Sequence, residues 1–99
     1  MINFRLIVGF DWDEGNSRKS YEKHAVSQAE AEQTFFNDPL LLLLDEKHSN
    51  KEARYHAYSK TDKGRKLHIA FTLRENNTLI RVISARDMHR KERMIYDKA

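Results

Sequence analysis

The chain has 99 residues, which is enough for one domain with a modest hydrophobic core and too few for two. The chain contains no cysteine, which excludes a disulfide framework and a thiolate zinc site. Its formal net charge of +3 is unevenly distributed, because residues 1–50 carry a balance of −4 and residues 51–99 a balance of +7. A basic half points to a polyanionic partner, most commonly nucleic acid, although basic side chains also simply solvate an exposed face.

Neither a secretion signal nor a membrane segment is expected. Residues 1–5 lack the basic flank and the long apolar stretch of a signal peptide. The longest apolar run, Leu40–Leu44, is far shorter than the ~20 residues that span a bilayer. We therefore expect a cytoplasmic protein with no membrane partner.

The chain should begin with a strand and a helix. Side chains alternate between apolar and other types through Phe4–Trp12, which is the period of a strand with one strongly apolar face. Asp13 follows and can cap a helix that runs to about Lys23.

A second helix and a short strand should follow. Ser27 and Glu30 have the spacing of a capping box, in which each side chain accepts a hydrogen bond from the backbone N–H of the other residue. The helix should run to about Phe36 and end at Asn37–Pro39, because proline disfavours a helical residue before it. Leu40–Leu44 then predicts a strand that is buried on both faces or lies across the sheet.

The second half predicts three strands and a closing helix. Asn76 and Asn77 favour a tight hairpin, because asparagine tolerates the left-handed conformation. Asp87 can cap the helix, and apolar positions such as Met88 and Ile95 should dock it. The expected elements are a loop over Asp45–Asn50, strands over Arg54–Ser59, Leu67–Arg74 and Leu79–Ala85, a turn at Thr61–Gly64 and a helix over Met88–Asp97.

The element order is therefore strand, helix, helix, four strands, helix. Strands grouped after a helical pair favour the α+β class, with an antiparallel sheet packed by two N-terminal helices and one C-terminal helix. We find no internal repeat, low-complexity segment or linker, so residues 1–99 are expected to form a single domain.

Three groups of segments, in order and covering nearly the whole chain, carry a family resemblance. They are Phe10–Asp13, Lys23–Ser27 and Glu30–Ala31; then Glu52–Tyr55, Gly64–Leu67 and Phe71–Arg74; and finally Arg81–Arg86, Glu92–Arg93 and Tyr96. In this combination they resemble the BrnT family, the ribonuclease toxins of one class of bacterial type II toxin–antitoxin systems. The most specific part is Ile83–Arg86 followed by Glu92 and Arg93.

The resemblance implies a fold like that of the RelE-type toxins, a compact sheet packed by helices. It also implies RNA cleavage that leads to growth arrest. A cognate antitoxin, usually a DNA-binding ribbon-helix-helix protein, would cover the toxin, and the complex would repress its own operon. DNA would then be contacted only through the antitoxin, and no cofactor is implied.

One position departs from the family pattern. Family members often have glycine where this chain has Ala25. A helix that ends there favours glycine in the left-handed conformation. Alanine therefore predicts a different cap, or a helix that continues a little further.

RNA cleavage without a metal needs a base for the 2′-OH, an acid for the departing 5′ oxygen and cations around the charged pentacovalent phosphorus. Histidine titrates near neutrality, so His24 is the expected proton-transfer group, assisted by the charge of Lys23. Arginine pairs with two phosphate oxygens at once. The catalytic candidates are His24, Arg65, Arg74 and Arg86, and the RNA-binding candidates are Lys23, Arg54, Arg81 and Arg93.

The same residues also have ordinary interpretations. His24 can simply complement a helix dipole, and the arginines can be exposed strand positions or partners of the acidic first half. Glu52 can act as a carboxylate base, but a solvated loop residue is the commoner role. His56, His68 and His89 are weaker candidates for proton transfer.

Two alternatives to a ribonuclease remain, a non-catalytic nucleic-acid-binding module and a protein-interaction module. Each would use the same basic surface, and neither requires a proton-transfer group. A metal site is not expected, because Asp45, His48 and His56 match no compact ligand spacing.

Overall fold

The computed structural model describes residues 2–99, which form an α+β domain with a five-stranded mixed sheet. The predicted class and element order are confirmed. Strands pair in the order β1-β5-β4-β3-β2, antiparallel except for the parallel pair β1–β5. The elements are β1 (Gly9–Phe10), α1 (Glu14–His24), α2 (Gln28–Thr34), β2 (Leu41–Leu44), β3 (Arg54–Lys60), β4 (Lys66–Arg74), β5 (Leu79–Asp87) and α3 (Arg90–Asp97), with short 3₁₀ turns at Phe4–Leu6 and Glu46–His48.

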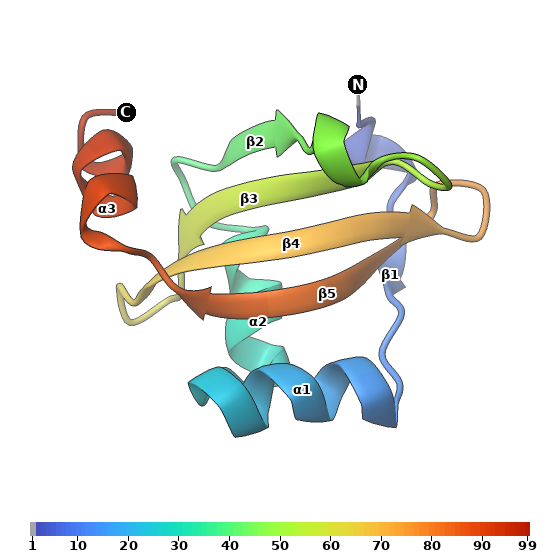
Figure 1. Cartoon of the computed structure of the whole chain (residues 1–99), viewed down its shortest axis with the longest axis horizontal. Helices are drawn as coiled ribbons and strands as arrows, with labels where there is room; N and C mark the ends of the chain where they lie inside the picture. Colours follow the sequence, from blue (N-terminus) through green and yellow to red (C-terminus); the bar gives the residue numbers. More distant parts are fainter. Residues whose placement is uncertain (1) are drawn as a thin grey trace.

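The helices leave one face of the sheet open. Figure 1 shows α2 behind the sheet, α1 alongside β5 and α3 at one end. The hydrophobic core lies on the α2 side and centres on Phe71 of β4, whose ring lies 5.1 Å from that of Phe35 and 5.4 Å from that of Tyr55. Because side chains alternate along a strand, the neighbours of these core positions point to the open face.

Local capping explains the two N-terminal helices. The carboxylate of Asp13 accepts the backbone N–H of Asn16, whose own side chain accepts the N–H of Asp13. Ser27 and Glu30 form the predicted reciprocal capping box at α2. Ala25 nevertheless ends α1 in the left-handed conformation, with φ of 54°, so the expectation of a different cap at this position is wrong.

The N-terminal strand is much shorter than predicted. Only Gly9 and Phe10 pair with β5, and the backbone bonds Val8 N–H to Thr78 O and Asp11 N–H to Ile80 O extend this pairing slightly. The preceding residues form a 3₁₀ turn instead. Phe4, Phe10 and Trp12 pack against the core as the alternation suggests, but Leu6 and Val8 are exposed. The strand is short because β5 begins only at Leu79 and α1 contacts its edge from Val82 onward.

The strand β2 forms as predicted, but it is not buried on both faces. It is the edge strand beyond β3, and Leu43 and Leu44 keep 59% and 53% of their surface exposed. Four consecutive leucines cannot report their own burial, because a run of identical residues carries no alternation.

The C-terminal helix begins later than predicted. Asp87 is the last residue of β5 rather than a helix cap, and His89 is the cap of α3. The carboxylate of Glu92 accepts the backbone N–H of His89, which provides the capping interaction. Met88 is buried just before the helix as expected, whereas Ile95 is 68% exposed.

Tyr96 docks α3 in place of Ile95. It is buried, and its hydroxyl donates to the carbonyl of Pro39 at 2.7 Å. Within residues 2–99, no helix has both the length and the apolar character needed to cross a membrane.

Candidate nucleic-acid interface

Helix α1 is fixed beside β5 by two buried side chains. The amide of Asn16 donates to the carbonyl of Val82 at 2.9 Å, and the hydroxyl of Ser20 accepts the N–H of Ala85 at 3.0 Å. The two elements therefore run side by side (Figure 1). Two hollows that contain basic side chains lie along this junction.

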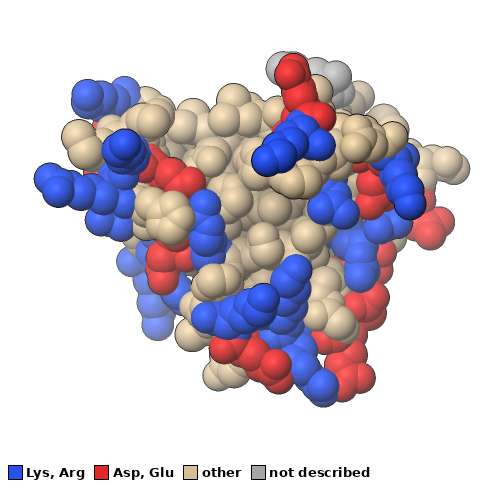
Figure 2. Space-filling model, in the orientation of Figure 1, with Lys and Arg blue, Asp and Glu red and all other residues tan. Residues whose placement is uncertain are grey.

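The first, which we call the arginine hollow, combines four cations with one carboxylate. Its charged lining residues are Lys19, Glu52, Arg54, Arg74 and Arg81, from α1, the loop before β3 and three strands. Thr72 of β4 pairs with Arg54 on one side and with Arg81 on the other, so the register of the sheet brings these arginines to one face. Figure 2 shows Lys and Arg side chains, with Asp and Glu side chains among them, around an uncharged centre on the open face.

The cations of the arginine hollow differ in how far they are neutralised. Arg81 forms ion pairs with Asp11 at 3.5 Å and Asp13 at 3.0 Å. Arg74 contacts Glu52 at 3.3 Å through Nη2, while its buried Nε has no hydrogen-bond partner among residues 2–99. No side-chain partner within the described chain engages the guanidinium of Arg54, so it is available to an anionic ligand.

The second hollow, which we call the histidine hollow, lies at the other end of α1. It is lined by residues 22–25 and 86–89, which bring two histidines, His24 and His89, together with two cations and two carboxylates: Lys23, Arg86, Glu22 and Asp87. Arg86 is largely committed to Glu92, because Nη1 and Nη2 donate to the two carboxylate oxygens at 2.8 and 3.0 Å. This fork lowers the pKa of Glu92 to about 2 and raises the pKa of Arg86.

Arg65 belongs to neither hollow. A guanidinium has five N–H donors, and Arg65 makes five hydrogen bonds to protein oxygens. They reach both carboxylate oxygens of Asp87, the carboxylate of Glu30 and the carbonyls of His24 and Ala25. The fork with Arg65 also lowers the pKa of Asp87. The side chain ties together the end of α1, the start of α2 and the end of β5.

The eight predicted site residues therefore do not form a single site. Arg54, Arg74 and Arg81 meet in the arginine hollow, and Lys23, His24 and Arg86 meet in the histidine hollow. Arg65 is a clamp, and Arg93 lies on α3 and donates to the carbonyl of Met88.

The sheet register gives the separation of the two hollows. Arg81 pairs with Thr72 and Arg86 pairs with His68. Four residues of strand separate Thr72 from His68, which at 3.3–3.4 Å per residue is about 13 Å. The two hollows cannot contact the same phosphate, but one RNA strand of a few nucleotides can reach both.

A chain of hydrogen bonds on the open face was missed by sequence reasoning. His56 Nδ1 lies 2.7 Å from His68 Nε2, and His56 Nε2 lies 3.2 Å from Asp45 Oδ2, which His48 also contacts at 2.9 Å. Burial and the nearby Arg86 charge lower the pKa of His68 to about 4. The signal was available in the alternation of β3 and β4, which places both histidines on one face.

These side chains do not create a metal centre. No group of three or more His, Cys, Asp or Glu in residues 2–99 is arranged to hold a metal ion. The contacts among Asp45, His48 and His56 are hydrogen bonds that hold the Glu46–His48 turn against β3.

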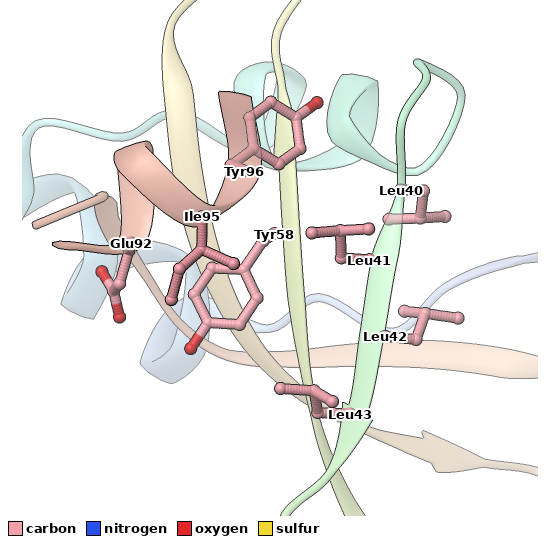
Figure 3. Close-up of a pocket in the computed structure, with 8 residues that line it drawn as sticks. All are labelled: Leu40, Leu41, Leu42, Leu43, Tyr58, Glu92, Ile95 and Tyr96. Atoms are coloured by element: carbon pink, nitrogen blue, oxygen red, sulfur yellow. The ribbon is translucent and has the colours of Figure 1, made fainter. Parts of the chain in front are cut away.

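A separate groove, between β2 and α3, is mostly apolar. Its lining residues come from β2, β3 and α3 and are labelled in Figure 3: Leu40, Leu41, Leu42, Leu43, Tyr58, Glu92, Ile95 and Tyr96. Glu92 is the only charged residue in this lining, and it is negative. The groove is therefore unsuited to RNA phosphates, and the open face beside α1 is the better candidate interface.

The fold and this basic face define a small α+β domain suited to polyanions. Residues 12–92 match the family model described as the ribonuclease toxin, BrnT, of type II toxin–antitoxin systems. The chain therefore belongs to this family of ribonuclease toxins, and an antitoxin protein is the partner that membership implies. None of the curated proteins matches the chain.

Proposed function

We propose that the protein cleaves RNA without a metal ion, with the RNA backbone lying along the junction of α1 and β5. The observation that carries this proposal is the excess of cations in the arginine hollow at one end of α1, with Lys23, His24 and Arg86 in the histidine hollow at the other end. Lys19 and Lys23 lie one helical turn apart and extend the positive charge from one hollow to the other. Phosphate oxygens are the ligands that such a row of cations recognises sequence-independently.

The proposed chemistry is attack of a 2′-OH on the neighbouring phosphorus. The protein supplies a proton-transfer group and cations that stabilise the charge developing on the phosphate. Arg54 and Arg74 are the best suited cations, because each retains guanidinium N–H groups that no residue of the described chain engages. His24, Lys23, Arg81 and Arg86 would hold neighbouring nucleotides or exchange protons with them.

Arg65 and Arg93 receive different proposed roles. Arg65 acts by positioning, because its clamp fixes the backbone at His24 and leaves it no free donor for RNA. Arg93 lies outside both hollows and would contact only RNA that extends toward α3.

The finer biology is proposed from family membership. The protein would act in the cytoplasm, and a ribbon-helix-helix antitoxin would neutralise it. The complex would then bind operator DNA through the antitoxin and repress the operon. Co-expression with the neighbouring gene should relieve growth arrest. An arrest that no neighbouring gene relieves would argue against this part of the proposal.

Incubating the purified protein with free RNA in EDTA tests the metal-free activity, and a translation extract that keeps its Mg²⁺ tests cleavage of RNA that is being translated. Cleavage should persist in EDTA, and Arg54→Ala should reduce it strongly. Arg18→Ala is the matched control, because Arg18 is an exposed α1 cation paired with Glu22. Binding with no cleavage in either setting would favour the non-catalytic module, and loss of cleavage in EDTA would exclude the metal-free reaction. If RNA is neither bound nor cleaved, the protein-interaction alternative stands.

A further inference from the structure

Building on the proposed ribonuclease activity, we propose that Glu52 is the general base and that the arginine hollow holds the reacting phosphate. Glu52 is the one carboxylate that lines this hollow within the described chain, beside Arg54, Arg74 and Arg81. Its side chain is 35% exposed, so a bound RNA strand can reach it.

Glu52 also keeps a free oxygen. Its Oε1 contacts Arg74 Nη2 at 3.3 Å, whereas no residue in 2–99 donates a hydrogen bond to its Oε2. This single contact orients the carboxylate toward the cations and leaves Oε2 without a hydrogen-bond donor. A carboxylate held in this way can accept the proton of a 2′-OH that lies against the neighbouring phosphate.

The other carboxylates near the basic face are poor candidates for a base. Asp13 caps α1 and pairs with Arg81. Glu92 and Asp87 are each held by an arginine fork, which lowers their pKa and makes them weaker proton acceptors. Glu52 is therefore the accessible and incompletely paired carboxylate that lies among the cations of the arginine hollow, whereas Glu22 lies in the histidine hollow at the other end of α1.

The arginines of this hollow are also better placed than those beside His24. The Nε of Arg74 is buried and lacks a partner within the described chain, and such a donor is costly to leave unsatisfied. That nitrogen is out of reach of solvent, but Arg74 Nη1 also has no partner among residues 2–99, and the side chain is 41% exposed, so a phosphate oxygen can bind there. In the histidine hollow, by contrast, both terminal nitrogens of Arg86 already donate to Glu92. That hollow can bind a neighbouring phosphate, but it offers less stabilisation to a reacting one.

The proposed step balances without a cofactor. The Glu52 carboxylate takes the proton of the 2′-OH, and the 2′ oxygen forms a bond to phosphorus while the bond from phosphorus to O5′ breaks. The departing O5′ takes a proton from water, and the protonated Glu52 then neutralises the hydroxide. The products are a 2′,3′-cyclic phosphate and a 5′-hydroxyl. Arg54 and Arg74 stabilise the charge on the phosphoryl oxygens during the transfer.

The test compares Glu52→Gln with wild type on a labelled single-stranded RNA of mixed sequence, free and in a translation extract. Loss of a general base should slow cleavage by about 10²–10⁴-fold. RNA binding should be retained or strengthened, because one negative charge is removed from the hollow. Glu52→Asp should recover part of the rate, and the wild-type product should end in a cyclic phosphate. Glu46→Gln, in the neighbouring 3₁₀ turn, is the matched control for loss of an exposed carboxylate.

His24→Ala distinguishes the two hollows. It should weaken RNA binding and slow cleavage much less than Glu52→Gln does, because His24 would contact a neighbouring nucleotide and not the reacting phosphate. If Glu52→Gln cleaves as fast as wild type, or if His24→Ala abolishes turnover while Glu52→Gln does not, this inference is wrong and the ribonuclease proposal stands. If wild type itself leaves the RNA intact in both settings, the ribonuclease proposal fails first. Thermal unfolding of each variant shows whether a lost rate reflects a lost fold.

Discussion

Replacing Arg65 with alanine should destabilise the protein, and any loss of RNA cleavage should follow from that. The side chain donates to both oxygens of Asp87, to Glu30 and to the carbonyls of His24 and Ala25. These bonds join three elements that meet at the end of α1. Their loss should therefore lower the unfolding free energy of the whole domain and not only loosen one turn.

The size of the stability loss depends on how exposed the partners of Arg65 are. Hydrogen bonds to charged groups contribute about 1.5–3 kcal/mol each, but the side chains of Asp87 and Glu30 are 62% and 32% exposed, so water replaces much of what is lost. We expect a net loss of about 2–3 kcal/mol from a total on the order of 5–15 kcal/mol. For a domain of this size that corresponds to a fall in Tm of about 10–20 °C.

The assay is urea and thermal unfolding followed by circular dichroism, with Arg54→Ala as the matched control. Arg54 has no side-chain partner among residues 2–99, so its removal should change the unfolding free energy by less than about 0.5 kcal/mol. Arg65→Lys should fall in between, because lysine keeps the charge but not the fork. If Arg65→Ala unfolds like wild type yet no longer cleaves RNA, the side chain acts on RNA directly and the clamp interpretation is refuted.

Two further predictions concern stability. Ala25→Gly should raise the unfolding free energy by about 0.5–1 kcal/mol, because glycine adopts the observed φ of 54° without strain; a lower Tm for this variant would contradict the argument. Stability should also fall on acidification in two steps. Burial lowers the pKa of His68 from 6.5 to about 4, so its contribution, on the order of 2–3 kcal/mol, is present above pH 6.5 and lost between there and pH 4. Arg86 lowers the pKa of Glu92 from 4.5 to about 2, so a contribution on the order of 1–2 kcal/mol is lost below pH 4.5. Urea unfolding from pH 8 to 2 measures both steps. A flat profile between pH 6.5 and 4 would refute the assignment to His68, and His68→Gln should remove that step alone.

Sequence signals predicted correctly those features that depend only on a few adjacent residues. The capping box of Ser27 and Glu30 and the turn at Asn76 and Asn77 depend on a few adjacent residues, and both form as predicted. The N-terminal strand failed for the opposite reason. Its length depends on how much of the β5 edge is available, and nothing within Phe4–Trp12 encodes that edge.

The candidate site could be predicted only in its residue types. The sequence identified the basic side chains, but it could not divide them between two hollows. That division depends on the strand register and on the position of α1 against β5. Arg65 shows the difficulty most clearly. In sequence it resembles Arg54, yet Arg65 fills all its guanidinium donors within the protein, whereas the guanidinium of Arg54 makes no hydrogen bond or ion pair within the described chain. Whether such an arginine holds the fold together or is free to bind RNA depends on the partners that distant elements supply.

The packing of α1 against β5 also determines when the basic face forms during synthesis and folding. The bonds from Asn16 to Val82 and from Ala85 to Ser20 join residues 66 and 65 positions apart. Contacts of such separation form only after a large loop has closed, which slows folding and delays their appearance during synthesis. Residues 79–89 are synthesised after every other residue that lines the two hollows, so neither hollow is complete before β5 is available. A nascent chain interrupted before β5 would carry Arg54 and Arg74 but neither Arg81 nor Arg86, and it would lack the strand against which α1 packs.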